Sequence, residues 1–221
     1  MSALRLYSYW RSSAAYRVRI ALQLKGLAYE YVPVHLLKGG GEQFSAEYRA
    51  LNPQSRVPAL ETPDGVLTQS MAILEWLEET QPLPALLPRS PGARARVRAM
   101  AQILVADVQP LQNTAVSQYL QHTLHVDDAA VKAWWGEWIG RGLSALEDLL
   151  GRRSGTPDGG DFCVGDTPTF ADVCLIPQCA SSRRFGVDPE AYPRIRRIER
   201  HCSTIAAFQR AAPEHQPDAS T

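Results

Sequence analysis

Hydrophobic and polar positions in the N-terminal third of the chain follow two alternating periods. Short segments rich in β-branched and aromatic residues are typical of strands, and between them apolar residues recur every three or four positions, as on one face of a helix. In the first helical segment Ala14, Val18, Ala21 and Leu22 share such a face. The predicted elements are strand 6–9, a helix from Ser12 or Ser13 to about 25, strand 29–35, helix 45–51, strand 57–60, strand 66–68 and helix 70–80.

These elements have the order β-α-β-α-β-β-α, which restricts the topology. The initial β-α-β unit predicts that the first two strands are parallel, and Asp64-Gly65 predicts an antiparallel hairpin between the last two. Pro33 suggests that the second strand lies at an edge of the sheet, because proline cannot donate a ladder hydrogen bond. The expected N-terminal domain, residues 1–81, is therefore a small mixed α/β unit.

The pattern beyond residue 81 is different. A proline-rich linker, 82–91, leads into a wholly helical domain, 92–221, with no strand signal. Thr169 and Asp172 have the spacing of a capping box at the start of one of its helices. The predicted elements are a long helix at 92–119 with a bend at Pro110, a helix at 127–150, a glycine-rich loop at 151–160, a helix at 169–182 containing Pro177, shorter helices from Pro193 to Ala212, and a frayed tail from Pro213.

Composition excludes several classes of protein. Among 221 residues the 23 Lys and Arg balance the 23 Asp and Glu, so neither nucleic acid nor a membrane surface is expected as the main partner. The first residues lead into a strand without the pattern of a signal peptide, which predicts a cytoplasmic protein. The 4 cysteines form no zinc-binding spacing and are expected to be buried small hydrophobic residues. His122 and His125 lack neighbouring ligands, so no metal site is predicted.

Candidate chemistry begins at the start of the first helix. Ser12 and Ser13 stand at its N-cap, where free backbone N–H groups and the helix dipole suit an anion. Arg11, Arg17 and Arg19 add positive charge to the same turn. This combination could hold a thiolate or a carboxylate. The alternative is structural, with serines that only cap the helix and arginines that are only solvated.

Two further polar corners follow in the chain. Val57-Pro58 before a short strand resembles the cis-proline turn of thioredoxin-like domains, which leaves backbone groups free for a peptide-like ligand. Gln69-Ser70 begins the next helix with an amide, a hydroxyl and free N–H groups, which suit an amino-acid carboxylate. Together with Ser12-Ser13 they are predicted to face one groove.

The whole chain resembles the glutathione transferases, and within them the zeta class. The motifs that carry the resemblance are Leu6-Tyr-Ser-Tyr, Arg17-Val-Arg-Ile-Ala-Leu22, Leu51-Asn-Pro53, Val57-Pro58, Gln69-Ser70, Leu77-Glu-Glu79, Gln109-Pro-Leu-Gln-Asn113, Val164-Gly-Asp166, Ala171-Asp172, Arg184-Phe185 and Gln216-Pro-Asp218. The resemblance implies a thioredoxin-like N-terminal domain, an all-α C-terminal domain, a homodimer and glutathione as cofactor. The implied reaction is glutathione-dependent cis–trans isomerisation of maleylacetoacetate to fumarylacetoacetate in tyrosine and phenylalanine catabolism.

The resemblance also implies roles for individual residues. The catalytic candidates are Ser12, assisted by Ser13, for the thiolate, and Arg11 and Arg184 for the dianionic substrate. Arg17 is a glutathione-binding candidate, although a helix-surface or interface position is expected for Arg17 and Arg19. The other candidates for binding glutathione or lining the groove are Gln43, Val57, Pro58, Gln69, Ser70, Gln109, Asn113, Thr114 and Ala115.

One departure from the class concerns its usual Ser-Ser-Cys. Here Ala14 replaces the cysteine, and Ala15-Tyr16 replaces the commoner Ser-Trp. The isomerisation does not need this cysteine, because glutathione brings its own thiol. Side activities attributed to the cysteine are not expected.

Three alternative functions follow from the same residues. Maleylpyruvate isomerases of gentisate degradation share the fold, and both Phe208-Gln-Arg-Ala-Ala-Pro213 and the absent cysteine resemble that branch. Gln112-Asn-Thr-Ala115 lacks the additional arginine expected there, so maleylacetoacetate is favoured. A transferase or dehalogenase acting on small α-halo acids would use the same thiolate. A non-catalytic binding protein would be expected to lose Ser12, Gln69 or Ser70, and all three are present.

Overall fold

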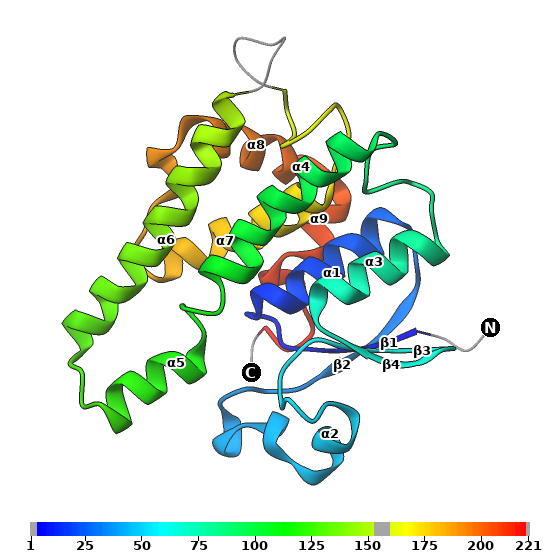
Figure 1. Cartoon of the computed structure of the whole chain (residues 1–221). Coiled ribbons are helices and arrows are strands. Elements are labelled where there is room, and N and C mark those ends of the chain that lie inside the picture. Colours follow the sequence, from blue (N-terminus) through cyan, green and yellow to red (C-terminus); the bar gives the residue numbers. More distant parts are fainter. Residues whose placement is uncertain (1–3, 153–159, 220–221) are drawn as a thin grey trace. The chain divides into compact units, whose positions relative to one another are not determined.

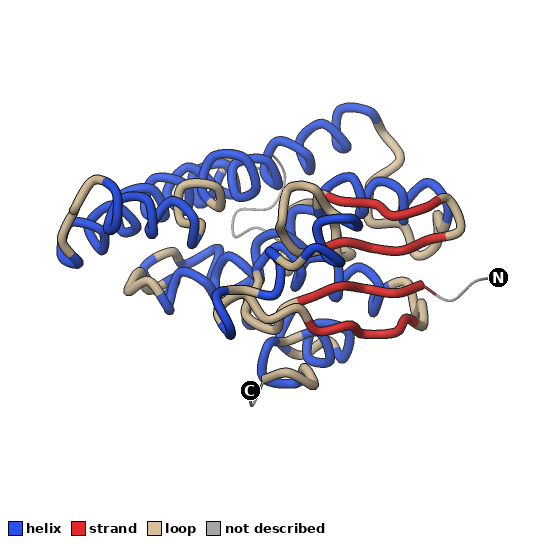
Figure 2. Tube along the Cα trace, turned by 90° about the horizontal axis from the view of Figure 1, so that it is seen from below, coloured by secondary structure: helices blue, strands red, loops and turns tan. Residues whose placement is uncertain are grey.

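Strand β1 (Leu4–Ser8) lies inside a four-stranded sheet of order β2-β1-β3-β4 in a computed structural model (Figure 2). The structure describes residues 4–152 and 160–219. It contains two units, one of residues 1–86 with 204–221 and one of residues 87–203. The first unit contains β1, α1 (Ser13–Leu24), β2 (Tyr29–Pro33), η1 (Lys38–Gly40), η2 (Glu42–Phe44), α2 (Ala46–Leu51), β3 (Ala59–Thr62), β4 (Gly65–Thr68), α3 (Ser70–Thr80), α9 (Ala206–Ala211) and η6 (Pro213–His215).

The strand pairing confirms the predicted topology. β1 is parallel to β2, and β3 and β4 form an antiparallel hairpin, as predicted. The sequence made no prediction for β1 and β3, which pair antiparallel. β2, which ends at Pro33, lies at an edge as expected. The first helix ends at Lys25-Gly26, where Gly26 has a positive φ of 65°.

Alternation along β1 distributes its side chains between the two faces of the sheet. Leu6, opposite Leu60, is fully buried. Helices α1 and α3 lie along one face of the sheet (Figure 1). Tyr7 joins an apolar cluster on the opposite face, where its ring makes an edge contact with Tyr48 of α2 at 6.0 Å. Both faces are therefore covered, and the loops at the end of the sheet carry the polar groups.

The C-terminal segment departs from the predicted domain limits. Residues 204–221 belong with the α/β unit, where α9 packs against α1, so the expected helical domain 92–221 ends earlier. The predicted fraying from Pro213 is also wrong. Gln216 donates to the carbonyls of Arg210 at 3.0 Å and Ala212 at 2.8 Å, and both Gln216 and Asp218 are buried. The polar composition of this C-terminal segment suggests fraying, but side-chain hydrogen bonds hold it in place.

The helical unit is built from α4 (Pro91–Gln102), η3 (Ile103–Val108), α5 (Thr114–Gln118), η4 (Tyr119–Thr123), α6 (Asp128–Gly151), α7 (Phe170–Arg184), η5 (Pro189–Ala191) and α8 (Pro193–Ser203). The single helix expected at 92–119 is interrupted. Its second part widens into the π-helical η3 and stops near Pro110, which lacks an N–H donor for the preceding turn. The glycine-rich loop predicted at 151–160 lies almost entirely outside the described residues.

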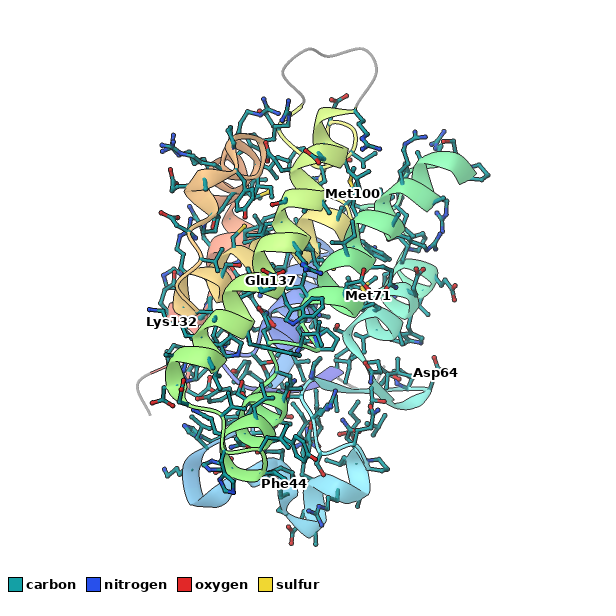
Figure 3. All side chains as sticks on the ribbon, turned by 60° about the vertical axis from the view of Figure 1, so that its left-hand side comes forward. Phe44, Asp64, Met71, Met100, Lys132 and Glu137 are labelled. Carbon is teal, nitrogen blue, oxygen red and sulfur yellow. The ribbon has the colours of Figure 1, made fainter. Side chains whose placement is uncertain are left out.

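Burial in the helical unit centres on α7. Every residue from Phe170 to Cys179 is buried, and the start of α7 has the predicted capping box of Thr169 and Asp172. All 4 cysteines of the chain are free and buried, as expected. Met100 of α4 is also buried, whereas Lys132 and Glu137 on α6 are exposed (Figure 3). No helix in the described ranges is both long and apolar enough to cross a membrane.

Candidate active site

The strand register brings three polar segments to the same end of the sheet. Tyr7 of β1 lies opposite Ala59 of β3, and Ala59 lies opposite Thr68 of β4. Since β1 runs antiparallel to β3, the turn after β1 and the segment before β3 lie at the same end of the sheet, and the segment after β4 lies at that end too. Ser12-Ser13, Val57-Pro58 and Gln69-Ser70 therefore occupy neighbouring loops, and that they face one groove stays a prediction.

Ser12 is the N-cap of α1. Its backbone is extended, its N–H donates to the carbonyl of Tyr9 at 2.9 Å, and its Oγ accepts the N–H of Ala15 at 3.2 Å. With Oγ acting as acceptor inside the helix, the hydroxyl proton is available to donate outward. The hydroxyl and the positive end of the helix dipole can therefore both stabilise an anion, whereas Ser13 is already the first residue of the helix.

Arg11 occupies the turn between β1 and α1. Its guanidinium lies over the indole of Trp10, 4.8 Å from the ring centroid, in a cation–π contact. Arg11 is exposed, whereas Trp10 is half-buried. The residue can present its charge to a ligand, as its candidate role requires.

Arg17 is not on the helix surface as expected. Its side chain is 1 % exposed, and Nη1 donates to Oγ of Ser70, the first residue of α3, at 3.3 Å. Because the arginine donates, the Ser70 hydroxyl retains its own proton for a carboxylate. A helix-face pattern could not reveal this position, because its partner is 53 residues further along the chain.

Arg19 is also buried rather than on the surface. It is fully inaccessible, and burial lowers the pKa of its guanidinium. The polar groups that offset this cost are the Ser8 hydroxyl and the carbonyls of Tyr9, Trp10 and Ala211, at 2.9 to 3.3 Å. Arg19 thus organises the turn ahead of Ser12 and is a structural residue.

The other predicted residues of this unit have polar groups near the same end of the sheet. Gln69 adopts a positive φ of 67° and donates to the side chain of Gln54 at 2.7 Å. The buried Gln43 donates to the carbonyl of Leu36 at 3.3 Å, and its Oε1 accepts no hydrogen bond from the described residues. Val57 and Pro58 are joined by a cis peptide bond, as predicted.

The helical unit carries the remaining predicted residues. Asn113 caps α5 by accepting the N–H of Ala115 at 3.0 Å, Thr114 is the first residue of that helix, and Gln109 ends η3. Arg184 is the last residue of α7, and its guanidinium lies 4.7 Å from the ring centroid of Phe185.

The loop at 109–113 contacts α7 through Gln112. Its amide donates to Gln178 at 3.0 Å and to Ser181 at 3.4 Å, one turn before Arg184. The hydrogen bonds of Gln112 therefore link the loop that carries Gln109 and Asn113 to the helix that ends at Arg184.

Sequence reasoning missed one functional candidate at the N-terminal end of the site. Asp218 accepts the backbone N–H of Trp10 at 3.1 Å and the hydroxyl of Tyr31 at 2.6 Å. Burial, followed by the hydrogen bond to Asp218, raises the pKa of Tyr31. In the sequence, Gln216-Pro-Asp218 contributes only to the resemblance to the zeta class. Local patterns cannot indicate a hydrogen bond between residues 208 positions apart.

Comparison with known proteins agrees with this geometry. Residues 2–79 match the glutathione S-transferase N-terminal domain, and residues 128–198 match the glutathione S-transferase C-terminal domain. The chain is 49 % identical to maleylpyruvate isomerase of Ralstonia sp. over 98 % of its length and 100 % of that protein. It is 48 % identical to maleylacetoacetate isomerase of Pseudomonas aeruginosa, covering 97 % of the chain and 98 % of that protein.

Solved structures give the same result. A maleylpyruvate isomerase described as a zeta-class glutathione S-transferase aligns with a TM-score of 0.92 at 49 % identity, over 97 % of this chain and 99 % of that one. Maleylacetoacetate isomerase of Anaeromyxobacter dehalogenans, with dicarboxyethyl glutathione and citrate in its active site, aligns with a TM-score of 0.85 at 47 % identity, over 98 % and 94 %.

The chain therefore belongs to the glutathione S-transferase family, with its thioredoxin-like and helical domains. Within that family its similarity over nearly the full length is to the zeta-class isomerases. The expected family and fold class are confirmed.

Proposed function

We propose that this chain is a glutathione-dependent cis–trans isomerase that converts maleylacetoacetate to fumarylacetoacetate. The observation that carries the proposal is the Ser12 hydroxyl at the amino end of α1, with its proton free to donate, in a chain similar throughout to isomerases of this class. The residues fit glutathione, since the edge of the sheet offers hydroxyl donors at Ser12 and Ser70 and a buried amide acceptor at Gln43. Glutathione binds in the active site of related structures.

Glutathione supplies, when bound, a thiolate that adds reversibly to the double bond, so that the carbon–carbon bond can rotate before elimination restores the alkene. An ordinary thiol has a pKa of about 8.5 and is mostly protonated near neutral pH. Ser12 lowers this pKa by donating a hydrogen bond from its hydroxyl to the thiolate sulfur, with help from the helix dipole. Ser13, one residue further, assists through its backbone N–H.

The proposal assigns carboxylate recognition to five residues. Gln69 and Ser70 receive the amino-acid end of glutathione, and Arg17 orients the Ser70 hydroxyl for that task. Arg11 and Arg184 hold the carboxylates of the substrate and stabilise the negative charge that develops on it. Gln109, Asn113, Thr114 and Ala115 contribute polar contacts from the helical unit.

A second candidate substrate is maleylpyruvate. The 49 % identity to a maleylpyruvate isomerase and Ala14 at the position of the class cysteine favour it. The mechanism would be unchanged, because the thiolate and the two arginines serve any maleyl keto acid.

The experiment is ultraviolet-monitored isomerisation of both substrates, each with and without glutathione, for the wild type and for Ser12→Ala. The proposal predicts glutathione-dependent turnover of maleylacetoacetate that falls at least about a hundredfold in the variant. Preference for maleylpyruvate would assign the second candidate. Turnover of neither substrate would refute the isomerase function.

The same proposal includes a cytoplasmic homodimer. Similarity to the zeta class supports it. Sedimentation equilibrium at micromolar concentration is expected to give twice the mass of the chain, and a single-chain mass would contradict the dimer.

A further inference from the structure

The backbone N–H and the backbone carbonyl of Trp10 each form a hydrogen bond with a charged side chain. The backbone N–H donates to Oδ2 of Asp218 at 3.1 Å, and the carbonyl accepts from Nη2 of Arg19 at 3.0 Å. Trp10 lies two residues before Ser12, in the turn whose Tyr9 carbonyl accepts the Ser12 N–H. The position of the Ser12 N-cap is therefore linked to these two charges.

Asp218 is itself firmly held. It is 6 % exposed, and its second carboxylate oxygen accepts the Tyr31 hydroxyl at 2.6 Å. Gln216, two residues earlier, ties the segment back to α9 through its hydrogen bonds to Arg210 and Ala212. The hydrogen bonds of Asp218 and Gln216 therefore hold the carboxylate in place where it accepts the Trp10 N–H.

Arg19 links the same C-terminal segment to the turn from a second direction. Its Nε donates to the carbonyl of Ala211 at 2.9 Å, while its Nη atoms donate to the backbone of Tyr9 and Trp10. The negative charge of Asp218 acts on this buried cation and partly offsets the lowering of its pKa by burial. Residues 211–218 and the turn therefore form one charge-assisted network.

The location of the Trp10 peptide indicates a role beyond stability. The turn borders solvent, since Arg11 is exposed and Trp10 half-buried, so water could satisfy its polar groups. Instead, a buried carboxylate near the end of the chain fixes the peptide that precedes the candidate catalytic serine. The Trp10 ring also carries the guanidinium of Arg11, so the same fixation orients the candidate substrate arginine.

We propose that Asp218 is a positioning residue of the active site, which acts through the Trp10 N–H to hold Ser12 and Arg11 in place. This inference rests on the proposed function of Ser12 and deepens it. A small misplacement of a catalytic group can reduce a rate by about a hundredfold, so a single hydrogen bond to this turn has a measurable consequence.

The test measures the pKa of the bound glutathione thiol, from the ultraviolet absorbance of the thiolate, in wild type and Asp218→Asn. The asparagine keeps the size of the side chain and removes its charge. We expect the thiol pKa to rise by about one unit and kcat/KM below that pKa to fall about tenfold. The Kd of S-methylglutathione, which has no thiol, should change less than about twofold, because Gln69 and Ser70 are untouched.

Glu214→Gln is the matched control, because Glu214 is an exposed carboxylate of the same C-terminal segment. It should leave both readouts at their wild-type values. Asp218→Asn should also have little further effect on the thiol pKa in a Ser12→Ala background, if Asp218 acts through Ser12. Equal shifts in both backgrounds, or an Asp218→Asn variant that behaves like the control, would overturn the role of Asp218.

The outcomes separate this inference from the proposed function. An unchanged thiol pKa in Ser12→Ala overturns the assignment of Ser12 and the role of Asp218 with it. A shifted thiol pKa in Ser12→Ala alone overturns only the role of Asp218. If Asp218→Asn does not fold, Tyr31→Phe removes one anchor of Asp218 and keeps its charge, so a smaller shift in the same direction is expected and no shift would overturn the role.

Discussion

Gln112 and Gln178 exchange two hydrogen bonds, each 3.0 Å long, between their buried side-chain amides. Gln178 also donates to the Ser182 hydroxyl at 3.2 Å. The pair joins the loop at 109–113 to α7 and satisfies polar groups in a region without access to water. It is therefore a connection that tolerates the loss of both partners better than the loss of one.

We predict that Gln178→Leu lowers the free energy of unfolding by about 2–3 kcal/mol, because it leaves the Gln112 amide buried without its partner. The double variant Gln112→Leu/Gln178→Leu should lose less than the sum of the single variants. Urea denaturation of the four proteins measures both effects. Additive losses would mean that the two amides do not act as a pair.

Lys25 and Glu78 form a buried ion pair at 2.8 Å. Lys25 also donates to the carbonyls of Gln81 and Pro84, and Glu78 accepts the N–H of Leu86. Lys25→Met should cost about 3–5 kcal/mol of stability, because Glu78 becomes an uncompensated buried charge. The exposed pair of Glu137 and Arg141 is the control, and Arg141→Met should cost less than about 1 kcal/mol. Similar losses at both positions would contradict the argument.

Arg17 supports the predicted carboxylate subsite through Ser70. We expect Arg17→Met to raise the KM for glutathione about tenfold while kcat at saturating glutathione stays nearly constant, since the contact serves binding rather than the chemical step. Steady-state kinetics with varied glutathione measure the split, and Arg5→Met, at a partly exposed ion pair with Glu30, is the control. A fall in kcat with unchanged KM would move Arg17 to a different role.

The stability of the protein should decrease at alkaline pH. Burial raises the pKa of Cys163, Cys179 and Cys202. A raised pKa in the folded state means that the unfolded thiols ionise first, so stability present below about pH 8.5 is lost as the pH rises above it. Each thiol should contribute a loss of about 1 kcal/mol between pH 7.5 and 9.5.

Urea denaturation at these two pH values measures the loss, and Cys202→Ala should reduce its size by the share of one thiol. A variant that lacks Cys202 but keeps the full pH dependence would show that other groups cause it.

Much of the fold could be predicted from local patterns. The hairpin of β3 and β4, the Ser12 cap and the capping box at Thr169 depend on residues close together in the chain, so periodicity and turn residues reveal them. The π-helical segment Ile103–Val108 could not be predicted, because its apolar spacing is that of an ordinary helix.

The candidate site was less accessible to such reasoning. The sequence predicts a helix-surface or interface position for Arg17 and Arg19, because arginine is usually solvated. Both are instead buried, and each donates a hydrogen bond to a residue far away in the sequence. The role of Asp218 could not be predicted either, because its partner Trp10 is also far away in the sequence. Hydrogen bonds to groups far away in the sequence, rather than local propensity, determine where these residues lie.

Ala14 and the buried cysteines have a consequence for an enzyme that depends on glutathione. Where the class carries a cysteine beside the candidate catalytic serines, this chain has the methyl group of Ala14, and each of its own thiols is buried. Oxidised glutathione therefore finds no accessible sulfur with which to form a mixed disulfide. The folded protein should keep its activity when a cell's glutathione is oxidised and then restored, because oxidation removes its cofactor and leaves the polypeptide unmodified.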